Sequence, residues 1–158
     1  MKLNKLITSV LFIVLLFLTS ESAFAQANGI GGNLGAGIML GEPSGITLKK
    51  WNNQRSAFDV GVAWSFSGNN DALLLQGDYL IHNWFNDIDE GRLAWYYGIG
   101  GRVVFANDAV VGARIPIGLN YLISDQPIGL FAEVAPILDL VPDTEFNGNG
   151  AIGIRYYF

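Results

Sequence analysis

Eight charged side chains recur along this chain within stretches where polar and apolar residues alternate. They are Lys49, Asp59, Asp78, Arg102, Arg114, Glu133, Asp139 and Arg155. Four are positive and four are negative, so they could neutralise one another if folding gathered them on one buried face. Charges removed from water are costly unless they are paired. We therefore expect a network of salt bridges with a structural role, or a gate in which the ion pairs exchange partners.

His82, the single histidine, follows Gln76 and Asp78 at alternating positions. An imidazole can serve as a general base or a pH switch. A base must lie within reach of its nucleophile, and no serine lies near His82 on the same segment. We expect a hydrogen-bonded structural histidine. The sequence gives no catalytic, cofactor-binding or metal-binding residue.

Turn-forming clusters divide the chain into eight segments that could position these side chains. The predicted strands are Gly29 to Leu40, Gly45 to Trp51, Ser56 to Phe66, Ala72 to Phe85, Arg92 to Phe105, Ala109 to Ile123, Ile128 to Leu140 and Asn149 to Phe158. Most reach the roughly 9 to 11 residues that a tilted membrane-spanning strand requires. If the sixth and seventh strands pair so that Tyr121 faces Ile128, Arg114 lies diagonal to Glu133 and can form a salt bridge.

The two faces of these segments differ in size as well as polarity. Bulky apolar residues such as Phe58, Val60, Trp95 and Ile99 fall on one face, and the eight charges fall on the other among many Gly and Ala residues. The interior of an eight-stranded barrel is only just wide enough for side chains, so the small and charged face fits inside. The bulky face then requires lipid. The predicted fold class is all-β, an eight-stranded antiparallel up-and-down transmembrane β-barrel.

Residues 1 to 25 are predicted to be a cleaved secretory signal peptide. Lys2 and Lys5 precede an apolar stretch that ends at Leu18, and Ala23-Phe24-Ala25 forms a small-x-small cleavage site. About 13 apolar residues are too few for a membrane anchor helix. Residues 26 to 158 then form one barrel domain. The chain has no cysteine, so it can hold no disulfide and no lipid-attachment cysteine.

The charge balance excludes a nucleic-acid partner. Without Lys2, Lys5 and Glu21, the nine basic and 14 acidic side chains of the chain fall to seven and 13. Nucleic-acid binders are instead basic.

The last strand ends in Gly-Ile-Arg-Tyr-Tyr-Phe, with Ile154, Tyr156 and Phe158 on one face. This ending resembles the signal that the bacterial barrel-assembly machinery recognises in outer-membrane precursors. The mature chain resembles the small eight-stranded outer-membrane β-barrels typified by the OmpA transmembrane domain and OmpX. The segment Gly41 to Lys49 is also similar to one in uncharacterised outer-membrane barrels of this size. The resemblance implies location in the bacterial outer membrane, with its lipids and the assembly machinery as partners and no cofactor.

Two further features concern the wall of the barrel. An aromatic girdle at the periplasmic interface is predicted from Trp51, Phe58, Phe85, Trp95, Tyr121, Tyr156 and Phe158. Pro116 and Pro136 fall inside strands, where each removes a ladder donor, and we expect a β-bulge at both. A lipid gateway between these strands is the alternative.

The expected function is a non-enzymatic outer-membrane barrel with a charge-paired, largely closed lumen and a structural or minor-permeability role. A narrow gated channel for small solutes or ions is the first alternative, and a lipid-modifying enzyme is the second. The sequence identifies no transported solute and no oligomeric state.

Overall fold

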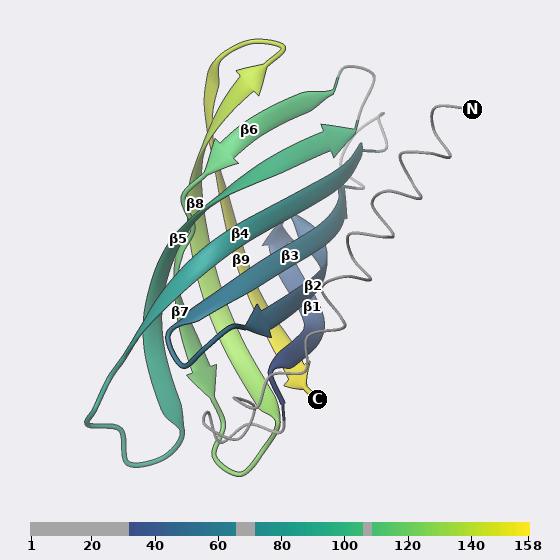
Figure 1. Cartoon of the computed structure of the whole chain (residues 1–158). Helices are drawn as coiled ribbons and strands as arrows, with labels where there is room; N and C mark the ends of the chain where they lie inside the picture. Colours follow the sequence, from purple (N-terminus) through teal and green to yellow (C-terminus); the bar gives the residue numbers. More distant parts are fainter. Residues whose placement is uncertain (1–31, 66–71, 106–108) are drawn as a thin grey trace.

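The computed structural model describes residues 32–65, 72–105 and 109–158, most of which lie in β-strands (Figure 1). The strands are β1 (Leu34–Glu42), β2 (Ser44–Trp51), β3 (Ser56–Ser65), β4 (Ala72–Trp84), β5 (Arg92–Phe105), β6 (Val110–Arg114), β7 (Ile117–Leu122), β8 (Ile128–Val141) and β9 (Glu145–Tyr157). The predicted signal peptide lies outside the described residues. No helix within the described ranges is long and apolar enough to cross a membrane.

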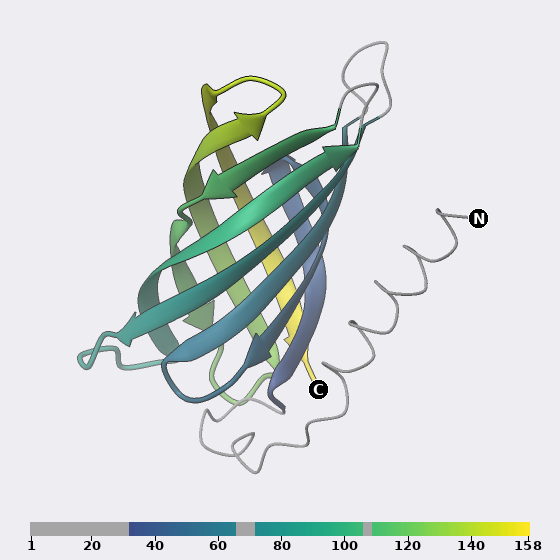
Figure 2. The ribbon, with the colours of Figure 1, turned by 45° about the horizontal axis from the view of Figure 1, so that its top comes forward.

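The strands pair into one antiparallel ring. Successive strands pair with each other except for β6 and β7, and β9 pairs back with β1, so that Gly35 faces Tyr157. Strands β6 and β7 share one place in this ring, because both pair with β5 on one side and β8 on the other. The ring therefore has the eight places that alternation predicts. Figure 2 shows the strands running obliquely around it.

Most strand bounds follow the sequence pattern. The predicted strand from Arg92 to Phe105 coincides with β5, and the predicted start of the eighth strand at Asn149 is wrong by four residues. The predicted turn from Val141 to Gly148 is mostly strand, because Asp139 still faces Glu145 in the β8–β9 ladder. This hairpin projects at the upper end of the barrel (Figure 1). We call the opposite end, where Phe158 lies, the lower end.

The two strand prolines interrupt hydrogen bonds without shifting the register. Arg114 faces Ile137 and Ile117 faces Val134, so equal numbers of residues lie between the two pairs on both strands. The expected bulges at Pro116 and Pro136 are therefore wrong, and the register shift in this ladder lies between Val111 and Gly112.

At each proline, only one of the two hydrogen bonds that facing strand residues normally exchange is formed. Gly98 N–H donates to the Pro116 carbonyl, and Ile115 N–H donates to the Pro136 carbonyl. Neither proline has an N–H to return the bond. Two ladder hydrogen bonds are consequently missing near the break between β6 and β7. One would run from position 116 to the Gly98 carbonyl on β5, and the other from position 136 on β8 to the Ile115 carbonyl.

The inward glycines provide space for large inward side chains. The Tyr157 ring lies against Gly35 and Gly129, where added Cβ atoms would approach it to 2.6 Å and 2.9 Å. The Tyr96 ring occupies the corresponding space at Gly118, and the Phe131 ring occupies that at Gly153. The alternation of Gly with bulky residues thus fills the interior of the barrel.

Candidate functional site: the lumen

The lumen collects the polar side chains that the strand alternation turns inward. The buried polar residues are Thr47, Lys49, Ser56, Asp59, Gln76, Asp78, His82, Arg114, Asn120, Asp139 and Arg155. Of the eight charges singled out in the sequence, six are buried in this set, and Arg102 and Glu133 are partly buried beside it. The eight charges come from seven strands, so the closed ring is what brings them together.

Arg155 on β9 anchors one cluster across the barrel. Its Nη2 donates to Asp59 Oδ2 at 2.5 Å and to Thr47 Oγ1 at 2.9 Å. The Thr47 hydroxyl in turn donates to Asp59 Oδ1 at 2.8 Å. The Arg155 guanidinium also lies 3.8 Å from the centre of the Phe131 ring. A planar, weakly hydrated guanidinium suits such a site, because it combines hydrogen bonds with stacking.

Arg114 on β6 forms the second cluster and contacts two carboxylates. Its Nη2 donates to Glu133 Oε1 at 2.6 Å, and its Nη1 lies 3.2 Å from Asp78 Oδ2. Tyr96 O–H donates to Glu133 Oε2 at 2.8 Å. One arginine therefore joins side chains from β4, β5 and β8.

The register on which the Arg114–Glu133 pairing was predicted is wrong. Tyr121 faces Leu130 rather than Ile128, and Glu133 faces Gly118. Arg114 is thus four residues from Glu133 along the ladder, beyond the diagonal distance expected. The two side chains meet because both extend into the lumen, where long side chains reach past their nearest ladder neighbours.

Arg102 on β5 forms a third cluster toward the upper end. Its Nε and Nη2 donate to the two oxygens of Asp139 at 3.0 Å and 2.6 Å. Asn147 Nδ2 donates to Asp139 Oδ2 at 2.7 Å. This fork geometry fixes both side chains.

Lys49 differs from the other three cations, because no carboxylate of the described residues forms a salt bridge with it. Its Nζ lies 2.7 Å from His82 Nε2 and faces the rings of Trp51 and Tyr96 at 4.8 Å and 5.0 Å. Equal numbers of positive and negative charges therefore do not form four separate pairs. Arg114 takes two carboxylates, and a histidine and two aromatic faces surround the lysine.

His82 is fully enclosed and accounts for both of its ring nitrogens. Nδ1 lies 3.3 Å from the Arg55 carbonyl, which accepts only from N–H, so Nε2 is left to accept from Lys49. Trp51 and Tyr96 pack against the ring, with centroids 4.4 Å and 5.1 Å away.

An aromatic plug, which we define as Trp51, His82, Trp84 and Tyr157, fills the lower end of the lumen. Trp51 is 1% exposed, so its predicted place in the outer girdle is wrong. Trp84 stacks on Trp51 at 5.8 Å between centroids, and Leu122 and Tyr157 pack in the same cluster. The signal was present in the sequence, since Trp51 has the same parity as Lys49.

The outer face carries the remaining predicted residues. Ile154, Tyr156 and Phe158 are all exposed on the outside of β9. Phe58 and Tyr79 pack together near the lower end, as do Trp95 and Tyr97. These residues form an outer aromatic band toward that end.

Comparison with known proteins supports the fold. No protein-family model and no curated protein matches the sequence. The structure is similar to the N-terminal β-barrel domain of OprF from Pseudomonas aeruginosa, with a TM-score of 0.57 and 12% sequence identity over 79% of this chain and 95% of that one. The chain has the fold of a small outer-membrane β-barrel. At 12% identity the similarity shows the fold alone.

Proposed function

We propose that the protein is a non-enzymatic integral barrel of the bacterial outer membrane, with a charge-paired and largely closed lumen. The observation that carries this proposal is its inverted polarity. Arg114, Lys49 and Arg155 are at most 2% exposed, whereas Ile99, Ile152 and Val134 on the outside are more than 60% exposed. Water would penalise such an exterior, and a bilayer would favour it.

The direction of insertion follows from the two ends of the ring. Three turns lie at the lower end, between β2 and β3, between β4 and β5, and between β7 and β8. The outer aromatic band lies toward this end, and we infer from it that the lower end faces the periplasm. We further propose that the outward face formed by Ile154, Tyr156 and Phe158 is the surface that the barrel-assembly machinery contacts.

The lumen supports a structural or minor-permeability role. The aromatic plug closes the lower end, and inward glycines are covered by Tyr96, Phe131 and Tyr157. An eight-stranded barrel has little interior space beyond what its side chains occupy.

A narrow gated channel is the second candidate, and Arg114 is the observation that favours it. Its guanidinium already contacts both Asp78 and Glu133. Asp78 Oδ1 has no hydrogen-bond partner among the described residues. A shift of Arg114 toward Asp78 would release Glu133 without leaving the guanidinium unpaired, which is the partner exchange that a gate requires.

Lipid modification is disfavoured by the surroundings of His82. Nε2 is occupied by Lys49, and aromatic rings cover the imidazole. A general base must instead present a free nitrogen to the proton that it removes.

Membrane fractionation followed by planar-bilayer recording tests these proposals. We expect the chain to enter the outer membrane, to shift its gel mobility on heating as folded barrels do, and to give no steady openings. Steady openings that change when Arg114→Met and Glu133→Leu are combined would establish the channel instead. Recovery of the folded chain in a soluble fraction would contradict both candidates.

A further inference from the structure

The outer wall along β8 and β9 is hollowed by three adjoining depressions of about 450, 840 and 350 Å³. The first two share Val134, and the last two share Leu40 and Ile152. They therefore adjoin one another, and we call the three together the furrow, whose lining residues on β9 run from Phe146 to Ile154. Glu133 is the one charged residue among those that line it.

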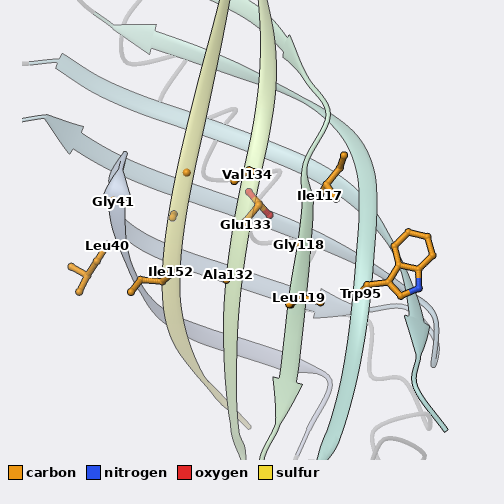
Figure 3. A pocket seen from close by; sticks show the side chains of 12 residues that line it. Leu40, Gly41, Trp95, Ile117, Gly118, Leu119, Ala132, Glu133, Val134 and Ile152 are labelled. Carbon is orange, nitrogen blue, oxygen red and sulfur yellow. The ribbon is translucent and has the colours of Figure 1, made fainter. Parts of the chain in front are cut away.

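The furrow arises from small residues on a face that is otherwise bulky. Leu40, Ile152, Ala132, Leu119 and Trp95 face one another in one row across β1, β9, β8, β7 and β5. Ala132 is the single small side chain in that row, and it forms the floor. Figure 3 shows Leu40 and Ile152 on one side of the hollow and Trp95 on the other.

The floor continues upward along the same strands. Gly150 and Gly148 point outward from β9, opposite Val134 and Pro136 on β8. A Cβ added at Gly150 would have no neighbour closer than 3.9 Å. The depression therefore belongs to the outside of the wall and does not depend on the packing of the lumen.

The width and length of the furrow limit the kind of molecule that can bind in it. Ile152 and Leu119 stand on strands two places apart, so their backbones are about 10 Å apart and their side chains narrow the gap further. An α-helix, about 10–12 Å across, is too wide for this gap. Phe146 to Ile154 spans roughly 26 Å of strand at about 3.3 Å per residue. With a tilt of about 45°, that length covers somewhat more than half of a hydrocarbon core about 30 Å thick.

We propose that the furrow binds one acyl chain of a membrane lipid, extended along β8 and β9. This inference rests on the proposed membrane location, since only a bilayer presents such chains to this wall. A linear apolar chain matches the narrow, apolar and elongated shape. The site is on the outer surface and is separate from the charged lumen.

Photo-crosslinking from the acyl chain tests the proposal. The full chain, exported and matured in a Gram-negative host, is reconstituted in phosphatidylethanolamine–phosphatidylglycerol vesicles with a trace of phosphatidylcholine carrying a diazirine on one acyl chain. Labelled residues are then mapped by mass spectrometry. We expect labelling of Leu40, Leu119 and Ile152 to exceed that of Val60 and Tyr79, on the far wall, by about fivefold.

Two matched glycine substitutions separate the furrow from the rest of the wall. Gly150→Leu fills the furrow, whereas Gly77→Leu adds the same side chain on β4, four strands from β9 in either direction, where nothing lies within 4 Å of the added Cβ. We expect Gly150→Leu to reduce labelling of Leu119 and Ile152 to the level of the far wall, and Gly77→Leu to leave it unchanged.

Four results would overturn the proposal. Equal labelling around the wall, or no effect of Gly150→Leu in a chain that inserts and shifts its mobility on heating, would remove the site but leave the membrane barrel intact. Labelling of Leu119 and Ile152 that is weaker than that of the far wall, and that rises as the chain is diluted in lipid, would make the furrow a contact between two copies. A chain that does not insert would overturn the membrane location and the furrow together.

Discussion

Arg114 shows how single residues determine the character of this lumen. It is 1% exposed, and Asp78 and Glu133 approach the same guanidinium from different strands. A buried ion pair adds little net stability compared with a well-packed apolar pair, but removal of one partner leaves an uncompensated charge. The consequence of a substitution therefore depends on which partners remain.

A double-mutant cycle at Arg114 and Glu133 measures this dependence. We expect Arg114→Met to lower the free energy of unfolding by about 3–5 kcal/mol, because it leaves two buried carboxylates without their cation. Glu133→Leu should lower it by less, because Asp78 still lies beside the guanidinium. The double variant should lose less than the sum of the single losses. Urea unfolding of the barrel in lipid vesicles, followed by tryptophan fluorescence, gives the values.

Arg55→Ala is the control for that cycle. Arg55 lies in the exposed β2–β3 turn and donates to Asn83 Oδ1 at 3.1 Å. Its loss should change stability by no more than about 0.5 kcal/mol. Strict additivity of the Arg114 and Glu133 losses would mean that the two side chains do not interact.

The residue scale also shows how far the sequence predicts the lumen. Alternation places Arg114, Glu133 and Arg155 on the same inner face, because parity alone decides the side of a strand. Which inward side chains contact one another depends on how far each extends across the lumen. Strand parity does not give this, so the Lys49–His82 contact could not be predicted. The prediction of Trp51 in the outer girdle is wrong because it rests on the position of an aromatic residue at a strand end, whereas the parity that Trp51 shares with Lys49 places it inside.

At the scale of elements, Tyr157 illustrates how β9 locks to its neighbours. Its ring lies against Gly35 on β1 and close to Gly129 at the start of β8. The missing side chains at Gly35 and Gly129 leave room for the Tyr157 ring.

Gly35→Ala should therefore lower the unfolding free energy by about 1–3 kcal/mol, because the added methyl group overpacks the Tyr157 ring. The same change in a Tyr157→Leu background should cost less, since the nearest contacts at position 35 are all atoms of that ring. Gly77→Ala, where no atom lies within 4 Å of the new Cβ, is the matched control and should be close to neutral. Chemical denaturation of the four variants provides the comparison; equal losses at positions 35 and 77 would contradict the ring contact.

The break between β6 and β7 predicts that the barrel opens locally more easily there, and we call this place the seam. Pro116 and Pro136 each withhold one reciprocal ladder bond, from Gly98 and from Ile115. Local opening is easier where hydrogen bonds are fewer. Hydrogen–deuterium exchange should be faster at the Gly98 and Ile115 amides than at the uninterrupted β3–β4 ladder.

Pro116→Ala restores the missing N–H and should slow exchange at Gly98, while the β3–β4 amides serve as the internal control. Unchanged exchange at Gly98 would show that the seam is held by side chains instead.

Strand positions can be predicted from the sequence better than strand register and hairpin length. Polarity alternation located the strands well, because period two is a direct property of the extended chain. The two prolines interrupt the ladder as predicted, but their effect on register depends on the number of residues in the facing strand. The upper part of the β8–β9 hairpin was missed because Asp143, Glu145 and Asn147 resemble a turn in composition.

At the scale of the whole molecule, the distribution of polarity requires a particular solvent. The polar clusters lie inside a closed ring, and large apolar side chains cover its outside. Packing alone does not distinguish a soluble barrel from a membrane barrel. The two can be distinguished by whether an added charge on the outer surface lowers or raises the free energy of unfolding.

Ile99→Lys provides that test. Ile99 is 67% exposed and lies midway along β5. In a bilayer, a lysine at mid-depth should lower the unfolding free energy by about 2–4 kcal/mol, whereas the same change in the β4–β5 turn, Ile88→Lys, should cost no more than about 1 kcal/mol. If water surrounded the barrel, Ile99→Lys would not lower the free energy of unfolding, because replacement of an exposed isoleucine by lysine removes apolar surface from solvent. Equilibrium unfolding of both variants from lipid vesicles measures the difference, and equal stabilities at the two positions would contradict a lipid-facing wall.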